Sequence, residues 1–326
     1  MRRDRGVVEI VRAYRRLTTP ERSARAGAGA PVLVALSGGA DSSALLLALW
    51  SAKVPVVAGH VLHDLRTAAE ARADRGACVA LCARLGVPLL HARVKVKGRV
   101  GNAEGNARAL RYAALARLAR KAGVAWIATG HHGHDQLETV LLALLRGSGP
   151  RGLAGIAPSR GVGKGVRVIR PMLGVSPGDA RRVCAEAGVR WCEDASNADV
   201  GLRRNRIRAG VLQELLAIKP DAAERAVQAG ELLREAERVV RRRAGVVSRR
   251  GAGAKWSRAG LARERPIVIG AVLGAAAKAL SGRVVPQRVL MAAARVIRSD
   301  CTDPKRFSGG GCVIEVRSGT VGVVRG

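Results

Sequence analysis

Val32-Leu33-Val34-Ala35-Leu36-Ser37-Gly38-Gly39-Ala40-Asp41-Ser42, followed by the helical pattern Ser43-Ala44-Leu45-Leu46-Leu47-Ala48-Leu49, is the stretch that decides the fold. An apolar run ends in a short loop of glycine and hydroxyl residues, and a helix starts directly after it. Backbone N–H groups of such a loop converge on an anion, and the helix N-terminus adds about half a positive charge. The stretch therefore predicts a strand, a phosphate-binding loop at residues 37–42 and a helix. We expect Ser37, Gly38, Gly39, Ala40, Asp41 and Ser42 to contact the phosphates.

Asp41 indicates which phosphate ligand the loop takes. A carboxylate beside a polyphosphate is repulsive unless a divalent cation lies between them, and Mg²⁺ is bound in this way. The sequence thus predicts ATP with Mg²⁺ at Asp41. The loop matches neither the G-x-x-x-x-G-K-[ST] nor the G-x-G-x-x-G pattern.

The composition favours a polyanionic partner. The chain has 326 residues, of which 48% are hydrophobic, so it can form two folded domains. Its 57 Lys and Arg against 25 Asp and Glu give a formal charge of +32, which favours nucleic acid over a neutral small molecule alone.

Cysteine usage and hydropathy indicate a cytoplasmic protein that does not enter a membrane. The six cysteines form no C-x-x-C pair, as expected in a reducing compartment. Met1-Arg2-Arg3-Asp4-Arg5 lacks the apolar segment of a signal peptide. The longest apolar stretch, residues 267–280, is shorter than the roughly 20 residues that a bilayer requires.

Apolar runs alternate with helical patterns along the first two thirds of the chain. This alternation predicts an α/β fold, a Rossmann-like parallel sheet with its ligand at the carboxyl ends of the strands. Residues 147–165 read as a long glycine-rich connection, and beyond residue 218 the chain reads as mainly helical, with a terminal hairpin at 312–316 and 320–324. The strands are expected at residues 31–36, 54–61, 89–94, 125–129 and 166–169, and the helices at 7–17, 42–51, 67–85, 104–122, 136–145, 176–187, 222–243 and 284–297.

Residues 128–139, A-T-G-H-H-G-H-D-Q-L-E-T, place a polar cluster where a strand passes into a helix. Asp135 and Glu138 are three residues apart, so on a helix they share one face and can hold Mg²⁺ or a substrate ammonium. The three histidines leave a zinc site open as an alternative, although no cysteine lies near them in the sequence.

Arginines dominate three further segments. These are N-A-E-G-N-A-R-A-L-R-Y at 102–112, with Arg108 and Arg111; R-G-S-G at 146–149; and E-D-A-S-N-A-D at 193–199, followed by Arg204-Asn205-Arg206-Ile207-Arg208. Arginine with asparagine suits contacts to phosphates and base edges. A solvated helix face or a salt-bridge cluster at a domain junction would account for them equally well.

In combination with S-G-G-A-D-S, these segments resemble the tRNA(Ile)-lysidine synthetases, a family of N-type (PP-loop) ATP pyrophosphatases. The resemblance covers about residues 32–208. It implies a PP-loop ATP pyrophosphatase domain at 31–215 behind an N-terminal helix and linker at 1–30. Residues 216–326 would then form a helical, basic tRNA-binding region with a small terminal β unit.

The resemblance also implies a reaction: a C–N-bond-forming ligase adenylates carbon-2 of the wobble cytidine in a CAU-anticodon tRNA(Ile). L-lysine then replaces AMP, and lysidine is formed. Asp41, Asp135 and Glu138 would be catalytic, with Asp135 and Glu138 binding lysine and accepting a proton. A homodimer is compatible with the resemblance. The residues expected to bind tRNA or phosphate are Arg108, Arg111, His132, Arg146, Arg204, Asn205 and Arg206.

Two positions depart from the family pattern. His134 stands where the family often has a second acidic residue, and Asp64 stands where the motif H-x-x-H-G-L-R has glycine. Two other readings therefore stay open: another PP-loop tRNA-modifying enzyme, such as a thiolase, or a tRNA-binding protein with a degenerate nucleotide site.

Overall fold

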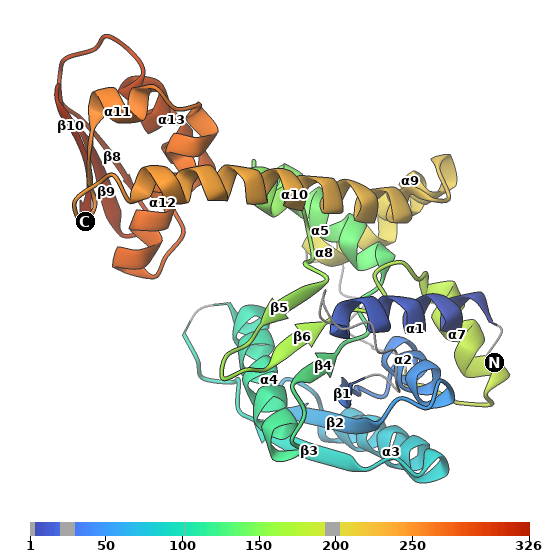
Figure 1. The fold of residues 1–326 in the computed structure, drawn as a ribbon. Coiled ribbons are helices and arrows are strands. Elements are labelled where there is room, and N and C mark those ends of the chain that lie inside the picture. The colour runs from blue at the N-terminus through green and yellow to red at the C-terminus, as the bar shows by residue number, and fades with distance from the viewer. Residues whose placement is uncertain (1–3, 20–29, 101, 193–202) are drawn as a thin grey trace. The chain divides into compact units, whose positions relative to one another are not determined.

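A computed structural model gives the fold of the chain and describes residues 4–19, 30–100, 102–192 and 203–326 (Figure 1). The chain divides into two compact units. Unit 1 contains residues 1–138 and 156–227, and unit 2 contains residues 139–155 and 228–326. Within the described ranges, no helix is both long and apolar enough to cross a bilayer.

Unit 1 is built around a six-stranded sheet with the order β3-β2-β1-β4-β6-β5. All neighbours are parallel except β5 and β6. The fold class expected from the sequence is therefore confirmed. The strands are β1 (Val32–Ala35), β2 (Val56–His63), β3 (Leu89–Val94), β4 (Trp126–Ala128), β5 (Ser159–Gly161) and β6 (Arg167–Ile169).

The helices of unit 1 begin and end where local signals place them. Thr67 and Glu70 form a capping box at the start of α3, and Gly86 ends that helix in the left-handed conformation. Ser176 and Asp179 form a second capping box at α7. The helices with most of their residues in unit 1 are α1 (Arg5–Thr18), α2 (Ala40–Ser51), α3 (Ala68–Leu85), α4 (Ala103–Lys121), α7 (Pro177–Glu186), α8 (Arg203–Arg206), the π-helical turn η2 (Ile207–Val211) and α9 (Leu212–Ile218).

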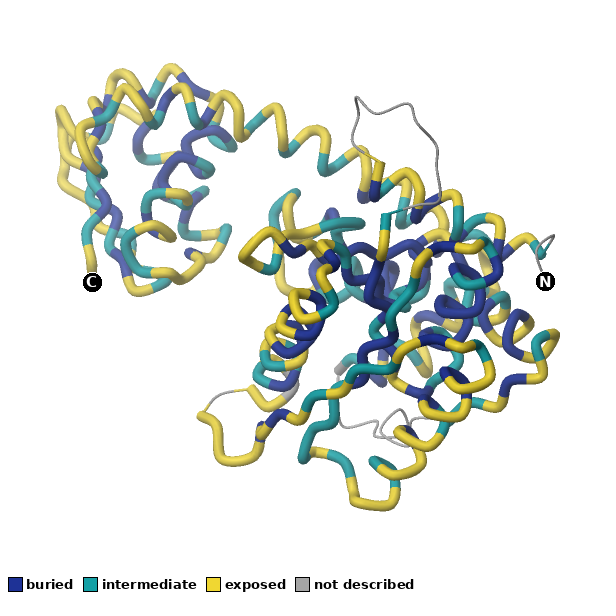
Figure 2. Tube along the Cα trace, turned by 60° about the horizontal axis from the view of Figure 1, so that its bottom comes forward, coloured by how far each residue is buried: buried dark blue, intermediate teal, exposed yellow. Residues whose placement is uncertain are grey.

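Two apolar cores cover the two faces of the sheet. Figure 2 shows the buried stretches of the chain in dark blue. Val32 and Val34 of β1 pack into a core with α1, α2, α3 and α7. Leu33, between them, belongs to a second core with α4. Because successive side chains of a strand point to opposite faces, β1 separates a face covered by α2 from a face covered by α4.

Unit 2 combines helices with a four-stranded antiparallel sheet of order β7-β10-β9-β8. Its core includes Trp256, Leu273 and Ile314. The buried guanidinium of Arg258 donates to the carbonyls of Val296, Ile297, Ser299 and Cys301, so it holds the end of α13 to the start of α11. The remaining elements are α5 (Gly133–Leu145), α6 (Pro150–Leu153), α10 (Ala222–Ser248), β7 (Lys255–Ser257), α11 (Arg258–Ala262), α12 (Pro266–Ser281), α13 (Gln287–Ile297), β8 (Lys305–Gly309), β9 (Cys312–Val316) and β10 (Thr320–Arg325). Helices α5 and α10 have residues in both units.

The structure corrects one expectation and adds elements that the sequence did not locate. Residues 147–165 are not one irregular connection, because they contain α6 and the edge strand β5. The apolar stretch 267–280 is helix α12, whose Ile269, Val272 and Leu273 lie in the core of unit 2. Strands β7 and β8 were not expected at all, and they extend the predicted terminal hairpin to four strands.

Gly130 is required by close packing between β4 and the phosphate loop. A Cβ atom at this position would lie 3.0 Å from the carbonyl carbon of Asp41 and 3.1 Å from the backbone nitrogen of Ser42. We expect Gly130→Ala to lower the free energy of unfolding by about 1–3 kcal/mol, because backbone atoms have to move. Gly76→Ala in α3 is the matched control, since nothing lies within 4 Å of its added methyl group. Urea unfolding of both variants measures the difference, and equal stabilities would contradict this explanation.

Candidate active site

The phosphate loop lies at the carboxyl end of β1 and leads into α2. Gly38 has a φ of +93° and Gly39 is the N-cap of α2. The Ser42 hydroxyl oxygen accepts from the Ser37 backbone N–H at 3.1 Å, donates to the Gly39 carbonyl at 3.0 Å and lies 3.0 Å from the Ser37 hydroxyl oxygen. The predicted loop therefore has the form of a hydroxyl-lined turn at a helix N-terminus, which suits an anion.

Asp41, in the first turn of α2, faces the end of β4. Its Oδ2 is 3.7 Å from Nε2 of His132. Burial raises the pKa of Asp41, and the neighbouring Asp135 adds to this, while His132 opposes both. The strand order reverses between β1 and β4, so Asp41 lies at the crevice where ligands bind in open parallel sheets.

His132 links Asp41 to Asp135. The Asp135 backbone N–H donates to Nδ1 of His132 at 3.3 Å, and the His132 backbone N–H donates to Oδ2 of Asp135 at 3.1 Å. Because Nδ1 accepts, the neutral ring carries its proton on Nε2, which faces Asp41. The ring of His134 contacts that of His132 edge-on, with centroids 5.7 Å apart.

Asp135 and Glu138 share one face of α5, as predicted, and two arginines lie against both of them. Arg208 Nη2 is 2.9 Å from Asp135 Oδ1 and 3.2 Å from Glu138 Oε2. Arg204 pairs with Glu138 through Nε and lies 3.6 Å from Asp135. Burial tends to raise the pKa of Asp135, but His132, His131 and Arg208 outweigh it and lower the value. Glu138 is fully buried, and its pKa is raised by burial in spite of both guanidiniums.

The other arginines expected from the sequence are not brought together. Arg206 is exposed. It is two residues from both Arg204 and Arg208, so it projects from a different side of the helix. Arg111 is exposed on α4, and Arg146 is exposed after the end of α5 in unit 2. Asn205 is buried. The segment 193–199 lies outside the described residues.

Sequence reasoning missed Arg208 as a site residue. The sequence does contain a signal for Arg208. Arg204 and Arg208 are four residues apart, so on a helix they share one face. That face can pair with the two carboxylates of α5, which are three residues apart and also share a face. It also missed His131, whose Nε2 accepts from Arg108 at 3.3 Å and whose Nδ1 lies 2.9 Å from the Thr129 hydroxyl.

The donor set fits Mg²⁺ only together with phosphate oxygens. The described residues contain no group of three or more His, Cys, Asp or Glu side chains arranged to hold a metal, which also leaves the zinc alternative without a site there. Mg²⁺ characteristically takes one or two carboxylates and completes its shell with phosphate and water. The part-exposed carboxylate of Asp41 at the phosphate loop meets that description.

Asp64, one of the two departures from the family pattern, has a structural role. Its carboxylate accepts from the backbone N–H groups of Val96, at 2.7 Å, and Lys97. It therefore joins the turn after β2 to the segment before α4. The neighbouring Arg66 pairs with Asp74 of α3 at 3.2 Å.

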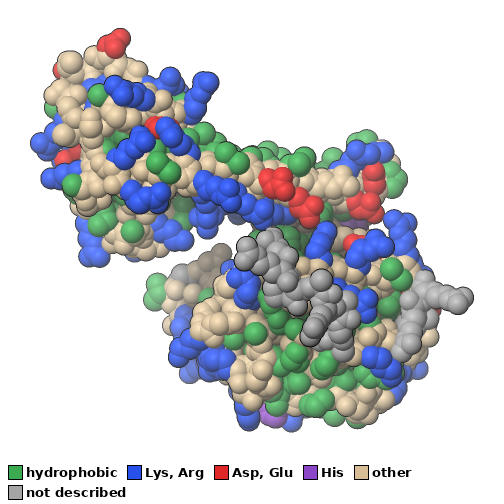
Figure 3. Space-filling model, viewed as in Figure 1, with side chains coloured by type: hydrophobic (Ala, Val, Ile, Leu, Met, Phe, Trp, Pro, Cys, Tyr) green, Lys and Arg blue, Asp and Glu red, His purple; other side chains and the backbone are tan. Residues whose placement is uncertain are grey.

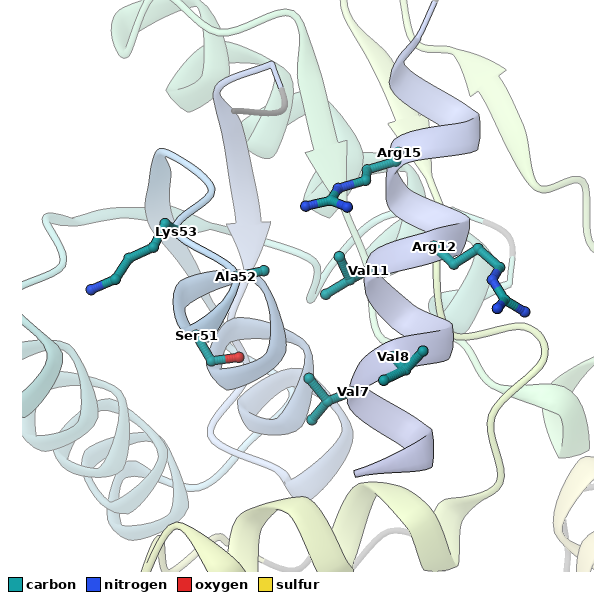
Figure 4. Close-up of a pocket in the computed structure, with 8 residues that line it drawn as sticks. All are labelled: Val7, Val8, Val11, Arg12, Arg15, Ser51, Ala52 and Lys53. Carbon is teal, nitrogen blue, oxygen red and sulfur yellow. The ribbon is translucent and has the colours of Figure 1, made fainter. Parts of the chain in front are cut away.

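A groove lies on another part of unit 1, between α1 and the end of α2, with Val7, Val11, Ser51 and Lys53 among its lining residues (Figure 4). Since Asp41 is in the first turn of α2 and Ser51 ends that helix, the groove is about 15 Å from the phosphate loop along the helix axis. It is separate from the candidate site.

Comparison with known proteins shows the family of this chain. A family described as the PP-loop domain matches residues 10–215. The chain belongs to the PP-loop family. Among its relatives, the tRNA(Ile)-lysidine synthase of Symbiobacterium thermophilum is 37% identical over 278 residues, covering 83% of this chain and 55% of that one. That of Salinispora arenicola is 39% identical over 232 residues, covering 70% and 68%.

The PP-loop fold also occurs in a solved structure, the U34-tRNA thiolase NcsA from Methanococcus maripaludis with its [4Fe-4S] cluster. It has a TM-score of 0.58 and 17% identity, and covers 71% of this chain and 81% of that one. At this identity the likeness shows the fold alone. The PP-loop chain described here spans about half the length of the first curated relatives that it matches.

The depressed pKa of His131 makes stability depend on pH. Burial and the positive charges of Arg170 and Arg108 lower the pKa of His131 to about 3, although the negative charge of Asp135 opposes them. Between pH 6.5 and pH 3 the unfolded chain binds a proton that the folded chain does not, so stability falls as the pH is lowered through that window. From pH 7 to pH 5 we expect His131 to account for a loss of about 2 kcal/mol. Urea unfolding at pH 7 and pH 5 should show a smaller loss of stability in His131→Gln than in the wild-type protein. An equal loss in both proteins would contradict this role of His131.

Arg204 and Arg206 provide a matched test of the buried ion pairs. Arg204→Met leaves Glu138 short of one cation and should destabilise the protein by about 3 kcal/mol, because a buried carboxylate loses its partner. Arg206→Met removes the same charge from an exposed position and should change stability by less than about 0.5 kcal/mol. Chemical denaturation of both variants at pH 7 measures the difference, and comparable effects would contradict the pairing.

Proposed function

We propose that this protein is a tRNA(Ile)-lysidine synthase. It would bind ATP and Mg²⁺ at the phosphate loop, adenylate carbon-2 of the wobble cytidine in a CAU-anticodon tRNA(Ile), and attach L-lysine there. The observation that carries the proposal is the convergence of the phosphate loop, Asp41, His132, Asp135 and Glu138 at the crevice between β1 and β4. The lysidine synthase relatives, with 37–42% identity, support the choice of reaction.

The first step would transfer AMP to the tRNA. The O2 oxygen of cytidine attacks the α-phosphorus, the bond from that phosphorus to the β-phosphate oxygen breaks, and pyrophosphate leaves. Ser37, Ser42 and the N-terminus of α2 hold the phosphates, and Asp41 is placed to hold Mg²⁺. When bound, the ion would neutralise charge that develops on the phosphate oxygens. His132, which Asp135 orients, lies beside that carboxylate, with its Nε2 3.7 Å from Oδ2 of Asp41.

The second step would form the C–N bond. The ε-nitrogen of lysine attacks carbon-2, and AMP leaves with the former carbonyl oxygen. Before it can attack, the ammonium must lose a proton, and Asp135 and Glu138 are the candidates to bind the cation and accept that proton. Both carboxylates are paired with Arg204 and Arg208, whose side chains are 29% and 35% exposed. Lysine binding at the pair therefore requires one guanidinium to move aside or to share its carboxylate.

The positive charge of residues 228–326 supports a tRNA partner. Residues 228–326 carry 20 Lys and Arg against 7 Asp and Glu, a net charge of +13. Blue Lys and Arg side chains are numerous over α10 and the C-terminal elements in Figure 3. Such a surface supplies sequence-independent contacts to the RNA backbone. The reaction would take place in the cytoplasm, which is consistent with a tRNA substrate, and a homodimer is compatible with the proposal.

The thiolase alternative is disfavoured by the cysteines. All six lie in the described ranges and are unpaired. Burial raises the pKa of Cys78 and Cys184 to about 12 and that of Cys82 to about 11, which keeps these thiols protonated. Protonated, dispersed thiols are poorly suited to hold an iron–sulfur cluster or to carry sulfur.

Incorporation of radiolabelled lysine tests the function. With ATP and Mg²⁺, the protein should incorporate lysine into a CAU-anticodon tRNA(Ile) transcript and not into one whose wobble cytidine is uridine. Asp41→Asn should lower pyrophosphate release by at least 100-fold and leave tRNA binding unchanged, because it removes charge stabilisation in the transition state. Absence of incorporation by folded wild-type protein that binds both ATP and tRNA would refute the proposal. Full turnover by Asp41→Asn would refute the role of that carboxylate.

A further inference from the structure

Three arginines surround Tyr112 in unit 1. The guanidinium carbon of Arg160 lies 4.6 Å from the centre of the Tyr112 ring, and that of Arg108 lies 5.5 Å from it. Arg170 Nη2 donates to the phenolic oxygen at 3.3 Å. Tyr112 and Arg170 are buried, with exposed fractions of 8% and 3%, whereas Arg108 is half-buried and Arg160 is exposed. The cluster thus has a buried floor and a side open to solvent.

Within the described residues, no carboxylate pairs with Arg108, Arg160 or Arg170. Arg170 donates to the Ala157 carbonyl and to Tyr112, and its buried Nε has no hydrogen-bond partner. Burial lowers the pKa of Arg170, and the positive charges of Arg160 and Arg108 add to the effect. The three arginines also lower the pKa of Tyr112 against the opposing effect of its burial. A buried guanidinium is costly unless an anion compensates it.

The cluster lies at the same edge of the sheet as the phosphate loop but on the other face. Arg170 directly follows β6, Arg108 is in the second turn of α4, and Arg160 is on β5. Tyr112 belongs to the core on the α4 face, whereas α2, which begins at the phosphate loop, covers the opposite face. His131 contacts Arg108 while the adjacent His132 contacts Asp41, so the end of β4 reaches both places.

We propose that Arg108, Arg160 and Arg170, arranged around Tyr112, bind a phosphate of the RNA backbone. This inference rests on the proposed function, since it assumes a polynucleotide substrate. Guanidinium forks match phosphate oxygens in pairs, and such contacts fix the register of a nucleic acid without reading its sequence. The proposed function already assigns the ATP phosphates to the loop at residues 37–42, which belongs to the other face of the sheet. A backbone phosphate held here would place the neighbouring nucleotide beside His131 at the end of β4.

Arg160→Ala is the decisive variant, with Arg167→Ala as its control. Both residues are exposed and lie on the β5–β6 hairpin, but the Arg167 guanidinium contacts the Ser159 hydroxyl and not Tyr112. Binding of a CAU-anticodon tRNA(Ile) transcript to the full chain is measured from 50 to 200 mM KCl, and ATP binding is measured separately without RNA. Arg160→Ala should weaken RNA binding about tenfold at the lowest salt and reduce the slope of log K against log salt by about 0.7–0.9. It should leave ATP binding unchanged, and Arg167→Ala should change neither.

The other outcomes separate failure of the inference from failure of the proposed function. RNA binding that is equal in the two variants shows that the cluster holds no RNA phosphate. Weaker ATP binding with unchanged RNA binding assigns the phosphate to the nucleotide. Wild-type protein that binds RNA but incorporates no lysine refutes the proposed function alone, because the ratio between the variants still decides the role of the cluster. Wild-type protein that binds no RNA refutes both.

Discussion

The pairing of Asp135 and Glu138 with Arg204 and Arg208 is the interaction on which the candidate site depends. It joins one turn of α5 to the continuous helical segment formed by α8 and η2. Glu138 is fully buried, so its charge is tolerated only because two cations accompany it. Asp135 in turn orients His132, and His132 faces Asp41. The buried ion pairs thus hold Asp135, and through it His132, beside the carboxylate of Asp41 at the phosphate loop.

At the carboxyl edge of the sheet, the two candidate binding regions lie on different faces. The phosphate loop and α2 belong to one face, and the arginines around Tyr112 belong to the other. Two adjacent residues, His131 and His132, serve the two sides because successive side chains in an extended segment point in opposite directions. A substrate that reaches both faces has to pass over the end of β4. This geometry suits a single-stranded nucleic acid better than a compact small molecule.

The sequence predicted the central parallel strands β1 and β4 well because each one is a continuous apolar run, as burial on both faces requires. It predicted Asp135 and Glu138 on one face because helical spacing alone determines that. Strand β5 was missed because Ser159–Gly161 is polar and borders the solvent at the edge of the sheet. Arg160 and Arg170 were missed because they become neighbours of Arg108 only through the pairing of β5 with β6 and the packing of α4. No local pattern encodes such a contact.

Neither compact unit is a continuous segment of the chain. The three boundaries fall inside α5, after Glu138, then after Gly155, and inside α10, after Val227. During synthesis on the ribosome, Asp135 and Glu138 emerge about 70 residues before the arginines that neutralise them. Until Arg204 and Arg208 appear, the carboxylates have to remain hydrated, so this part of unit 1 cannot reach its final packing. The nascent chain therefore completes this candidate site only after residues 139–155, which belong to the other unit, have already been made.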